Sequence, residues 1–205
     1  MDHLGALACS TDRLRQCLKL ITAESLGLPS SCLGWSVYDL ANHVIGGGHR
    51  YLLLLQGADA DDLVETRIQD HVGDDPVQSH RNWAELLKAA FAEPGSFDRT
   101  VHHPDGERTG LDLLRMRVLE QTLHGWDLSV SLAESEQIDE DLSTYLLDEC
   151  AGLLTNLRTV GRYAAPQDED QDDDPSTRLL HFAGRSHRRA LDTICCGNAE
   201  RSNER

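Results

Sequence analysis

The sequence predicts an all-α domain, a bundle of four main helices with additional helices towards the C-terminus. Hydrophobic residues make up 40% of the 205 residues while aromatic residues make up 5%, a balance that suits helices better than sheets. Apolar residues also recur near helical spacing along most of the chain. Two capping-box-like sequences stand directly before such stretches. A chain of this length most often forms one domain with its own hydrophobic core.

The expected helices can be placed in order from their start and stop signals. Ser36 with Asp39 starts the second helix, and Thr109 with Asp112 starts the fourth, each as S/T-x-x-D. Asp75 is an N-cap for the third helix, and the proline that follows it suits the first helical turn. We therefore expect helices over residues 4–26, 36–56, 75–93, 109–128, 139–161 and 176–185.

The remaining segments are expected to be loops, a turn and a tail. Residues 57–75 and 168–174 are rich in acidic side chains and are expected to be solvated loops. Residues 97–108 contain a Pro-Asp-Gly turn, which predicts a hairpin-like excursion between two helices. The bundle is expected to span residues 1–185, and the few apolar residues of 186–205 predict a flexible C-terminal tail.

The composition limits the kinds of partner. The formal net charge of −16 argues against a nucleic acid or an anionic membrane, since both bind basic surfaces. No stretch approaches the roughly 20 apolar residues of a membrane span, and the N-terminus lacks the pattern of a signal peptide. We expect a cytoplasmic protein with reduced cysteines and a small-molecule substrate. A small anionic substrate stays open, because local positive charge is available from Arg50, Arg117, Arg158 and Arg162.

One pair of residues in the fourth predicted helix has the spacing of metal ligands. Glu120 and His124 stand four residues apart, so both side chains lie on the same helix face and could hold one metal ion. Asp127 is near that face and could orient the imidazole. His43 on the second helix would complete a set of three ligands if the two helices face each other. Acidic residues and histidines are numerous, so a solvated or hydrogen-bonded helix face is the alternative.

Two further features have both a structural and a functional explanation. Gly46, Gly47 and Gly48 follow His43 inside a predicted helix, where each glycine costs up to about 1 kcal/mol relative to alanine. They indicate either a close helix contact or space for a ligand. The histidines at 102–103 could bind a metal, but histidines beside a tight turn more often face solvent.

Two sequence motifs together carry a resemblance to a known family. The sequence GWSVYDLANHV at 34–44, combined with LEQTLHGWDL at 119–128, resembles the DinB-like superfamily. Within that superfamily the chain is most similar to the metal-binding domain of mycothiol-dependent maleylpyruvate isomerase and to its small actinobacterial relatives. SSCLGW at 30–35 and RLLHFAGR at 178–185 add to the likeness. The resemblance covers about residues 10–186.

The resemblance implies a DinB-like four-helix bundle that binds a divalent metal ion. By this resemblance the ligands are His43, Glu120 and His124, and the metal is zinc, with nickel or another divalent ion as alternatives. Three protein ligands leave a coordination position open. A thiol such as mycothiol would lose its proton in that position and could attack an electrophile. Asp127 and Arg117 are then expected to be supporting catalytic groups.

The leading hypothesis is therefore a metal-dependent thiol S-transferase, acting on a small electrophile in detoxification or biosynthesis. One alternative is a metal-dependent hydrolase, lyase or isomerase that uses no thiol. Another is a non-catalytic protein that binds a metal or a small molecule. The chain is too short for the separate C-terminal domain of the isomerase, so isomerisation of maleylpyruvate is not expected. A homodimer is a further expectation, since bundles of this kind often pair through an exposed helix face.

Overall fold

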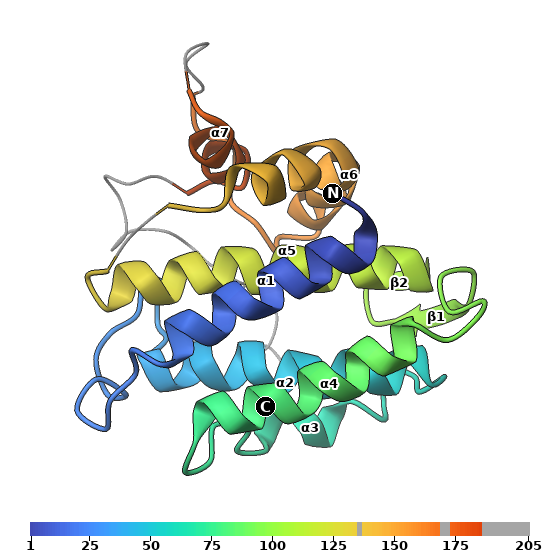
Figure 1. Cartoon of the computed structure of the whole chain (residues 1–205), viewed down its shortest axis with the longest axis horizontal. Coiled ribbons are helices and arrows are strands. Elements are labelled where there is room, and N and C mark those ends of the chain that lie inside the picture. Colours follow the sequence, from blue (N-terminus) through green and yellow to red (C-terminus); the bar gives the residue numbers. More distant parts are fainter. Residues whose placement is uncertain (135–136, 169–172, 186–205) are drawn as a thin grey trace.

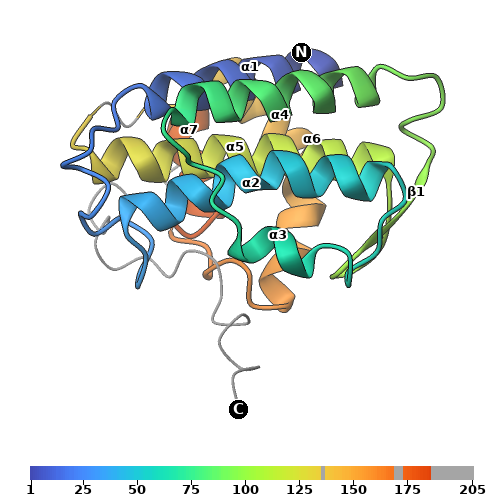
Figure 2. The ribbon, with the colours of Figure 1, turned by 90° about the horizontal axis from the view of Figure 1, so that it is seen from below.

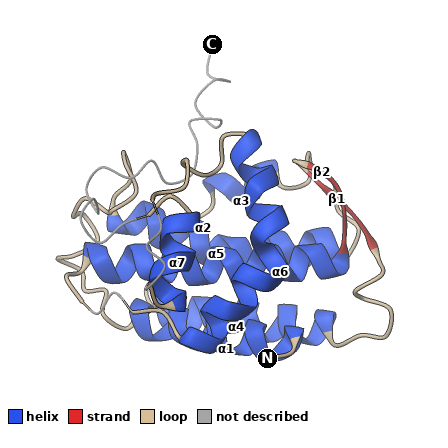
Figure 3. Ribbon diagram, turned by 90° about the horizontal axis from the view of Figure 1, so that it is seen from above, coloured by secondary structure: helices blue, strands red, loops and turns tan. Residues whose placement is uncertain are grey.

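The structure, a computed structural model, describes residues 1–134, 137–168 and 173–185. Helices make up almost all of its regular structure, with two short strands at one end (Figure 3). None of the described helices is long and apolar enough to cross a membrane. In chain order the elements are α1 (His3–Leu18), α2 (Val37–Leu55), α3 (Val64–Ile68), α4 (Pro76–Phe91), β1 (Thr100–His103), β2 (Gly106–Thr109), α5 (Gly110–Ser131), α6 (Glu140–Thr159) and α7 (Pro175–Phe182).

Helices α1, α2, α4 and α5 form a four-helix bundle (Figures 1 and 2). Contacts join α1 to α5, α5 to α2, α2 to α4 and α4 to α1, so each helix packs on two neighbours. α6 and α7 contact each other, and α6 also packs on α5. They are the additional C-terminal helices that the sequence predicts. The all-α bundle is confirmed.

The helix starts follow the predicted capping residues. The Ser36 hydroxyl accepts the Asp39 N–H at 3.1 Å, and the Asp39 carboxylate accepts the Ser36 N–H at 2.9 Å, which is a complete capping box. Thr109 and Asp112 make the same pair of bonds at the start of α5. At α4, the Asp75 carboxylate accepts the Gln78 N–H ahead of Pro76. Local hydrogen bonding therefore determines where these helices begin.

The first helix and the first acidic loop differ from the prediction. α1 ends at Leu18, eight residues before the predicted end at residue 26. The hydroxyl groups of Thr22 and Ser25 bond to each other's backbone N–H groups, at 2.9 and 3.3 Å. Such side-chain bonds compete with a helical backbone. Within the predicted loop at 57–75, the five residues of α3 form a helix.

The predicted excursion at 97–108 contains a β-hairpin. β1 and β2 pair antiparallel, with Thr100 opposite Thr109 and His103 opposite Gly106. Gly106 has φ of +107°, a conformation that glycine adopts readily. The hairpin therefore ends in a tight turn, and this turn carries His103 and Asp105 to the candidate site described below.

The three consecutive glycines of α2 allow close packing. A Cβ atom at Gly46 would overlap the His71 ring, and one at Gly48 would lie 2.7 Å from Trp83 Cβ. A Cβ at Gly47 would overlap Arg117 Nη1 and lie 2.7 Å from Glu120 Oε2. Of the two explanations that the sequence left open, close contact is therefore the correct one.

Some sequence predictions fall on residues that the structure does not describe. The predicted tail at 186–205 lies outside the described residues, as do residues 169–172 of the second acidic run. At the end of that run, the Asp174 carboxylate accepts the Ser176 and Thr177 N–H groups and caps α7.

A neutral histidine lies inside the bundle between α4 and α5. His80 is 1% exposed, and its Nε2 accepts the Gln121 amide at 3.4 Å. Burial, with the Arg117 guanidinium nearby, lowers the pKa of His80 to about 3. Between about pH 6.5 and pH 3 the unfolded chain therefore binds a proton at His80 that the folded chain does not. Stability is lost as the pH falls through this window.

We expect this loss to be measurable in the His80→Gln variant. Each pH unit in the window removes up to about 1.4 kcal/mol. Between pH 7 and pH 5, the free energy of unfolding of the wild type should fall by about 2 kcal/mol more than that of His80→Gln. Urea unfolding at both pH values measures this. The exposed His102 gives the control His102→Gln, which should behave as the wild type. Equal pH slopes for His80→Gln and the wild type would contradict the prediction.

Candidate metal centre

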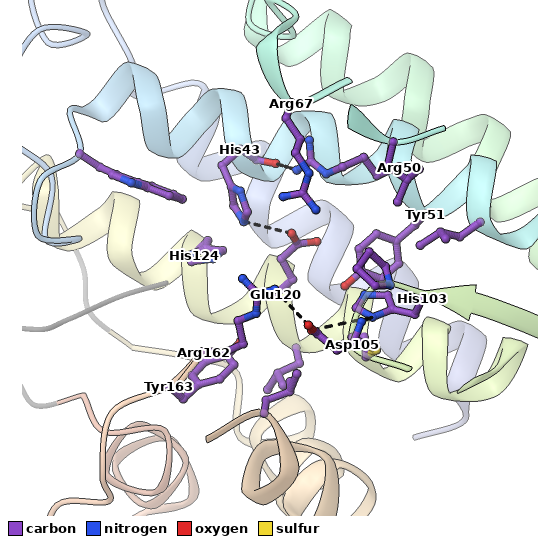
Figure 4. Close-up of a pocket in the computed structure, with 17 residues that line it drawn as sticks. His43, Arg50, Tyr51, Arg67, His103, Asp105, Glu120, His124, Arg162 and Tyr163 are labelled. Carbon is purple, nitrogen blue, oxygen red and sulfur yellow. Dashed lines mark hydrogen bonds and ion pairs between the residues drawn. The ribbon is translucent and has the colours of Figure 1, made fainter. Parts of the chain in front are cut away.

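The three predicted metal ligands line one cavity beside α2 and α5 (Figure 4). His43 lies on α2, and Glu120 and His124 lie on the facing side of α5. His43 Nε2 is 3.3 Å from Glu120 Oε1. The His43 and His124 rings are nearly perpendicular, with centroids 5.2 Å apart. The structure thus brings together one residue from α2 and two from α5.

Glu120 is held as a carboxylate by a buried arginine. Burial alone would raise the pKa of Glu120, but the charge of Arg117 and the hydrogen bond to His43 hold it well below its usual range. Arg117 is fully buried and donates from Nη1 to Glu120 Oε2 at 2.7 Å and to the Val44 carbonyl at 2.9 Å. Arg117 therefore lies behind Glu120 and does not line the cavity. Burial lowers the pKa of His43, so its imidazole is neutral, the form that binds metals.

His124 is oriented by Asp127, as the sequence suggested. Asp127 Oδ2 lies 3.0 Å from His124 Nδ1, which leaves Nε2 as the nitrogen for a ligand. Asp127 is fully buried, and both its oxygens accept bonds from Arg185, at 3.0 and 2.8 Å. Burial would raise the pKa of Asp127, but Arg185 and His124 hold it well below its usual range. The contact between Arg185 and Asp127 was not predicted from sequence. Arg185 stood there only as the last residue of the RLLHFAGR motif.

His124 also belongs to a second group of residues that could bind a metal ion. Ligand atoms of Cys32, His124 and Asp127 all lie within 4.8 Å of one another, and all three residues are buried. Asp127 there already accepts two bonds from the Arg185 guanidinium, whose positive charge opposes a cation. The cavity side of His124, with His43 and Glu120, has room for a ligand. Cys32 was not considered as a ligand from sequence, where the six cysteines show no CxxC pair.

The cavity has a volume of about 150 Å³, and a more polar space of about 240 Å³ adjoins it. Both spaces are lined by Trp35, His43, Arg50 and Arg67. The opposite wall carries residues from the hairpin turn and from the segment after α6. Two of the four arginines expected to supply positive charge, Arg50 and Arg162, therefore line the cavity, together with Arg67, which the sequence did not indicate.

The hairpin turn brings a further histidine to the cavity. His103 Nδ1 accepts the Asp105 backbone N–H at 3.1 Å, so the ring proton lies on Nε2. The Asp105 carboxylate also pairs with Arg162 at 3.0 Å, which joins the hairpin to the segment after α6 (Figure 4). The sequence favoured a solvent-facing position for residues 102–103. This is correct for His102, which is exposed, and wrong for His103.

Comparison with known proteins supports the resemblance. The family model of the mycothiol maleylpyruvate isomerase N-terminal domain matches residues 7–129. An uncharacterised protein found in two strains of Mycobacterium tuberculosis is 28% identical over 190 residues, which are 92% of this chain and 100% of the relative.

Two solved structures share the fold. The crystal structure of the mycothiol-dependent maleylpyruvate isomerase matches with a TM-score of 0.65 at 18% identity, covering 93% of this chain and 90% of that chain. A DinB-like protein of Bacillus subtilis matches with a TM-score of 0.52 at 14% identity, covering 67% and 94%. The match covers most of the isomerase chain, so length gives no argument against isomerisation. Because the family model spans more than half of this chain, the protein belongs to the family of the mycothiol maleylpyruvate isomerase N-terminal domain, with a DinB-like fold.

Proposed function

We propose that this protein is a metal-dependent enzyme that transfers a small thiol, mycothiol or a similar compound, to an electrophilic substrate. The observation that supports this most is the convergence of His43, Glu120 and His124 on one cavity. Two imidazoles and one ionised carboxylate are a donor set that suits zinc or nickel. A divalent ion there supplies Lewis acidity, which lowers the pKa of a bound thiol.

In this proposal the surrounding residues hold the ligands ready. Asp127 fixes the His124 ring through Nδ1, so that Nε2 faces the cavity. Arg117 keeps Glu120 ionised and aimed at His43. Trp35 lies against His43, with ring centroids 4.9 Å apart, and reduces access of water. Asp127 and Arg117 are therefore positioning residues, while the cavity itself binds the thiol and the electrophile.

We expect the purified protein to contain about one zinc or nickel ion per chain, and His124→Ala to contain much less. Elemental analysis of untagged protein measures this. The control is His102→Ala, since His102 is exposed on β1 and outside the cavity. A wild-type protein that holds no zinc or nickel, and takes up neither on addition, would remove the metal from the proposal.

The transfer step has its own test. Metal-loaded protein is incubated with mycothiol and 1-chloro-2,4-dinitrobenzene, and the S-conjugate is quantified by mass spectrometry. Conjugate should form faster than in the uncatalysed reaction, and the increase should be absent in His124→Ala. If the metal-loaded protein gives no increase with this or other activated electrophiles, the transferase assignment fails and a non-catalytic binding role is favoured.

A second candidate function follows from His103. Its ring lines the cavity and carries the proton on Nε2, so it could exchange a proton with a substrate held there. That chemistry suits a metal-dependent isomerase, lyase or hydrolase without a thiol. Product formation in the absence of any thiol, together with its loss in His103→Gln, would favour this candidate.

A further inference from the structure

The Tyr51 hydroxyl faces the cavity without a hydrogen-bond partner from the protein. Tyr51 lies on α2, about two turns after His43, and is 8% exposed. Figure 4 shows it pointing into the cavity that Glu120 and His103 also line. In the part of the chain that the structure describes, no group forms a hydrogen bond to its hydroxyl. The phenol oxygen is not sealed in the core, so it is open to a ligand in the cavity.

The Tyr51 ring is held in place from the core side. The guanidinium carbon of Arg117 lies 5.7 Å from the ring centroid, and the ring packs within the main hydrophobic cluster. Burial raises the pKa of Tyr51 well above its usual value, and the nearby charge of Glu120 raises it further. The hydroxyl therefore stays protonated at neutral pH and can donate a hydrogen bond. A phenylalanine would fill the same space, so packing does not account for the oxygen.

The carboxylates of the cavity do not use this donor. Among the described residues, Glu120 and Asp105 are the two carboxylates that line the cavity. Glu120 accepts a bond from Arg117 at 2.7 Å. Asp105 pairs with Arg162 at 3.0 Å. The Tyr51 hydroxyl is thus a donor for a ligand and not for a neighbouring side chain.

Much of the remaining cavity wall is apolar. It includes Leu54, Leu63, Met116, Leu119 and Leu157. The volume of about 150 Å³ is near that of an engineered cavity that holds benzene. Such walls favour a hydrocarbon group. A ligand that satisfies both the walls and the hydroxyl has one acceptor oxygen on a small apolar body.

We propose that Tyr51 donates a hydrogen bond to the oxygen at the reacting centre of the substrate, and that this substrate is an epoxide with an apolar body about the size of a benzene ring. An epoxide carries its acceptor oxygen on the carbon that a thiol attacks. It bears no charge, so the apolar walls do not oppose it. The proposal deepens the function proposed above and rests on it in one respect: the epoxide is the electrophile of the thiol transfer.

The hydrogen bond from Tyr51 acts on the bond that breaks. The sulfur of the thiol forms a bond to one epoxide carbon, and the electron pair of the broken C–O bond moves to the oxygen. Tyr51 stabilises the negative charge that develops there. The proton that the thiol gave up ends on this oxygen, so the product is a β-hydroxy thioether. The addition needs no oxidant and no other reactant.

The first test compares two electrophiles of similar size. Zinc-loaded protein is incubated with mycothiol and either cyclohexene oxide or benzyl chloride, whose reacting carbon bears no oxygen. In Tyr51→Phe the rate with the epoxide should fall about 100-fold more than the rate with benzyl chloride. Tyr38→Phe is the matched control, because Tyr38 also lies on α2 but bonds to Asp70 and lines neither cavity space. Both of its rates should equal those of the wild type.

The second test needs neither thiol nor metal. Cyclohexanone, a ligand of similar shape with one acceptor oxygen, is titrated into zinc-free protein and its binding is followed by NMR. Tyr51→Phe should bind it about three- to tenfold more weakly than Tyr38→Phe does. The urea unfolding midpoint of Tyr51→Phe should not fall below that of the wild type, because the hydroxyl bonds to no described residue.

The outcomes separate this proposal from the function on which it rests. Equal losses with the two electrophiles in Tyr51→Phe, no binding of cyclohexanone, or equal affinity in Tyr51→Phe and Tyr38→Phe would overturn the role of Tyr51. Wild-type transfer to benzyl chloride but not to cyclohexene oxide would overturn the epoxide and keep the transferase. A protein that binds cyclohexanone through Tyr51 but transfers no thiol would keep the hydrogen-bonding site and lose the proposed function.

Discussion

Replacing Asp127 by alanine is expected to lower the free energy of unfolding by about 3–5 kcal/mol. The carboxylate is fully buried and accepts both bonds from Arg185, which is itself 1% exposed. Removing one member of a buried ion pair leaves the other without compensation, and this is more harmful than removing both. Urea unfolding of metal-free protein at pH 7 measures the change.

The same variant should also weaken zinc binding by about 10–100-fold, because His124 loses the group that orients its ring. A double-mutant cycle separates the two effects. Arg185→Ala keeps the Asp127 to His124 contact, and the double variant should be less destabilised than the sum of the single ones. An Asp127→Ala protein with wild-type stability and wild-type zinc affinity would contradict the role assigned to this carboxylate.

Substituting Gly47 by alanine is expected to damage the candidate metal centre from the side opposite the cavity. The added Cβ would overlap Arg117 Nη1 and lie 2.7 Å from Glu120 Oε2. Arg117 cannot move freely, because it is buried and bonded to the Val44 carbonyl. Overpacking of this kind destabilises by about 1–3 kcal/mol. Displacement of Glu120 should lower zinc affinity as well.

Gly152→Ala is the matched control. Gly152 lies inside α6, and a Cβ atom there would meet nothing within 4 Å. The same chemical change should therefore stabilise the protein by about 0.5–1 kcal/mol, through helix propensity alone. Opposite signs for the two variants in urea unfolding are expected. If Gly47→Ala were also stabilising and kept full zinc affinity, close packing at Gly47 would not be a constraint on the site.

Features governed by neighbouring residues were predictable from sequence. The starts of α2 and α5 depend on hydrogen bonds between residues three apart, and the hairpin turn depends on its own short sequence. The predicted end of α1 was wrong because the Thr22 and Ser25 hydroxyls supply local hydrogen bonds that compete with the helix. α3 was missed because its five residues are too few to show a helical repeat; Leu63 and Thr66 are buried against the bundle.

Part of the candidate site was also predictable, because it depends on residues close together in the sequence. Four-residue spacing places Glu120 and His124 on one face of a helix, whatever surrounds that helix. His43 was a candidate on condition that the second and fourth predicted helices face each other, and the motif resemblance implied the same ligand. The structure places His43 Nε2 3.3 Å from Glu120 Oε1. That these three residues bind a metal stays a prediction.

By itself, the sequence determined the helix starts, the hairpin, the family and the pair on α5. Only the tertiary structure decided which groups surround that pair. Arg185 bonds to Asp127 from 58 residues further along the chain, and Arg67 reaches the cavity from a helix that the sequence did not reveal. Periodicity shows which residues share a face of one helix. Which faces meet depends on the packing of the whole chain, and the charge of the cavity follows from that packing.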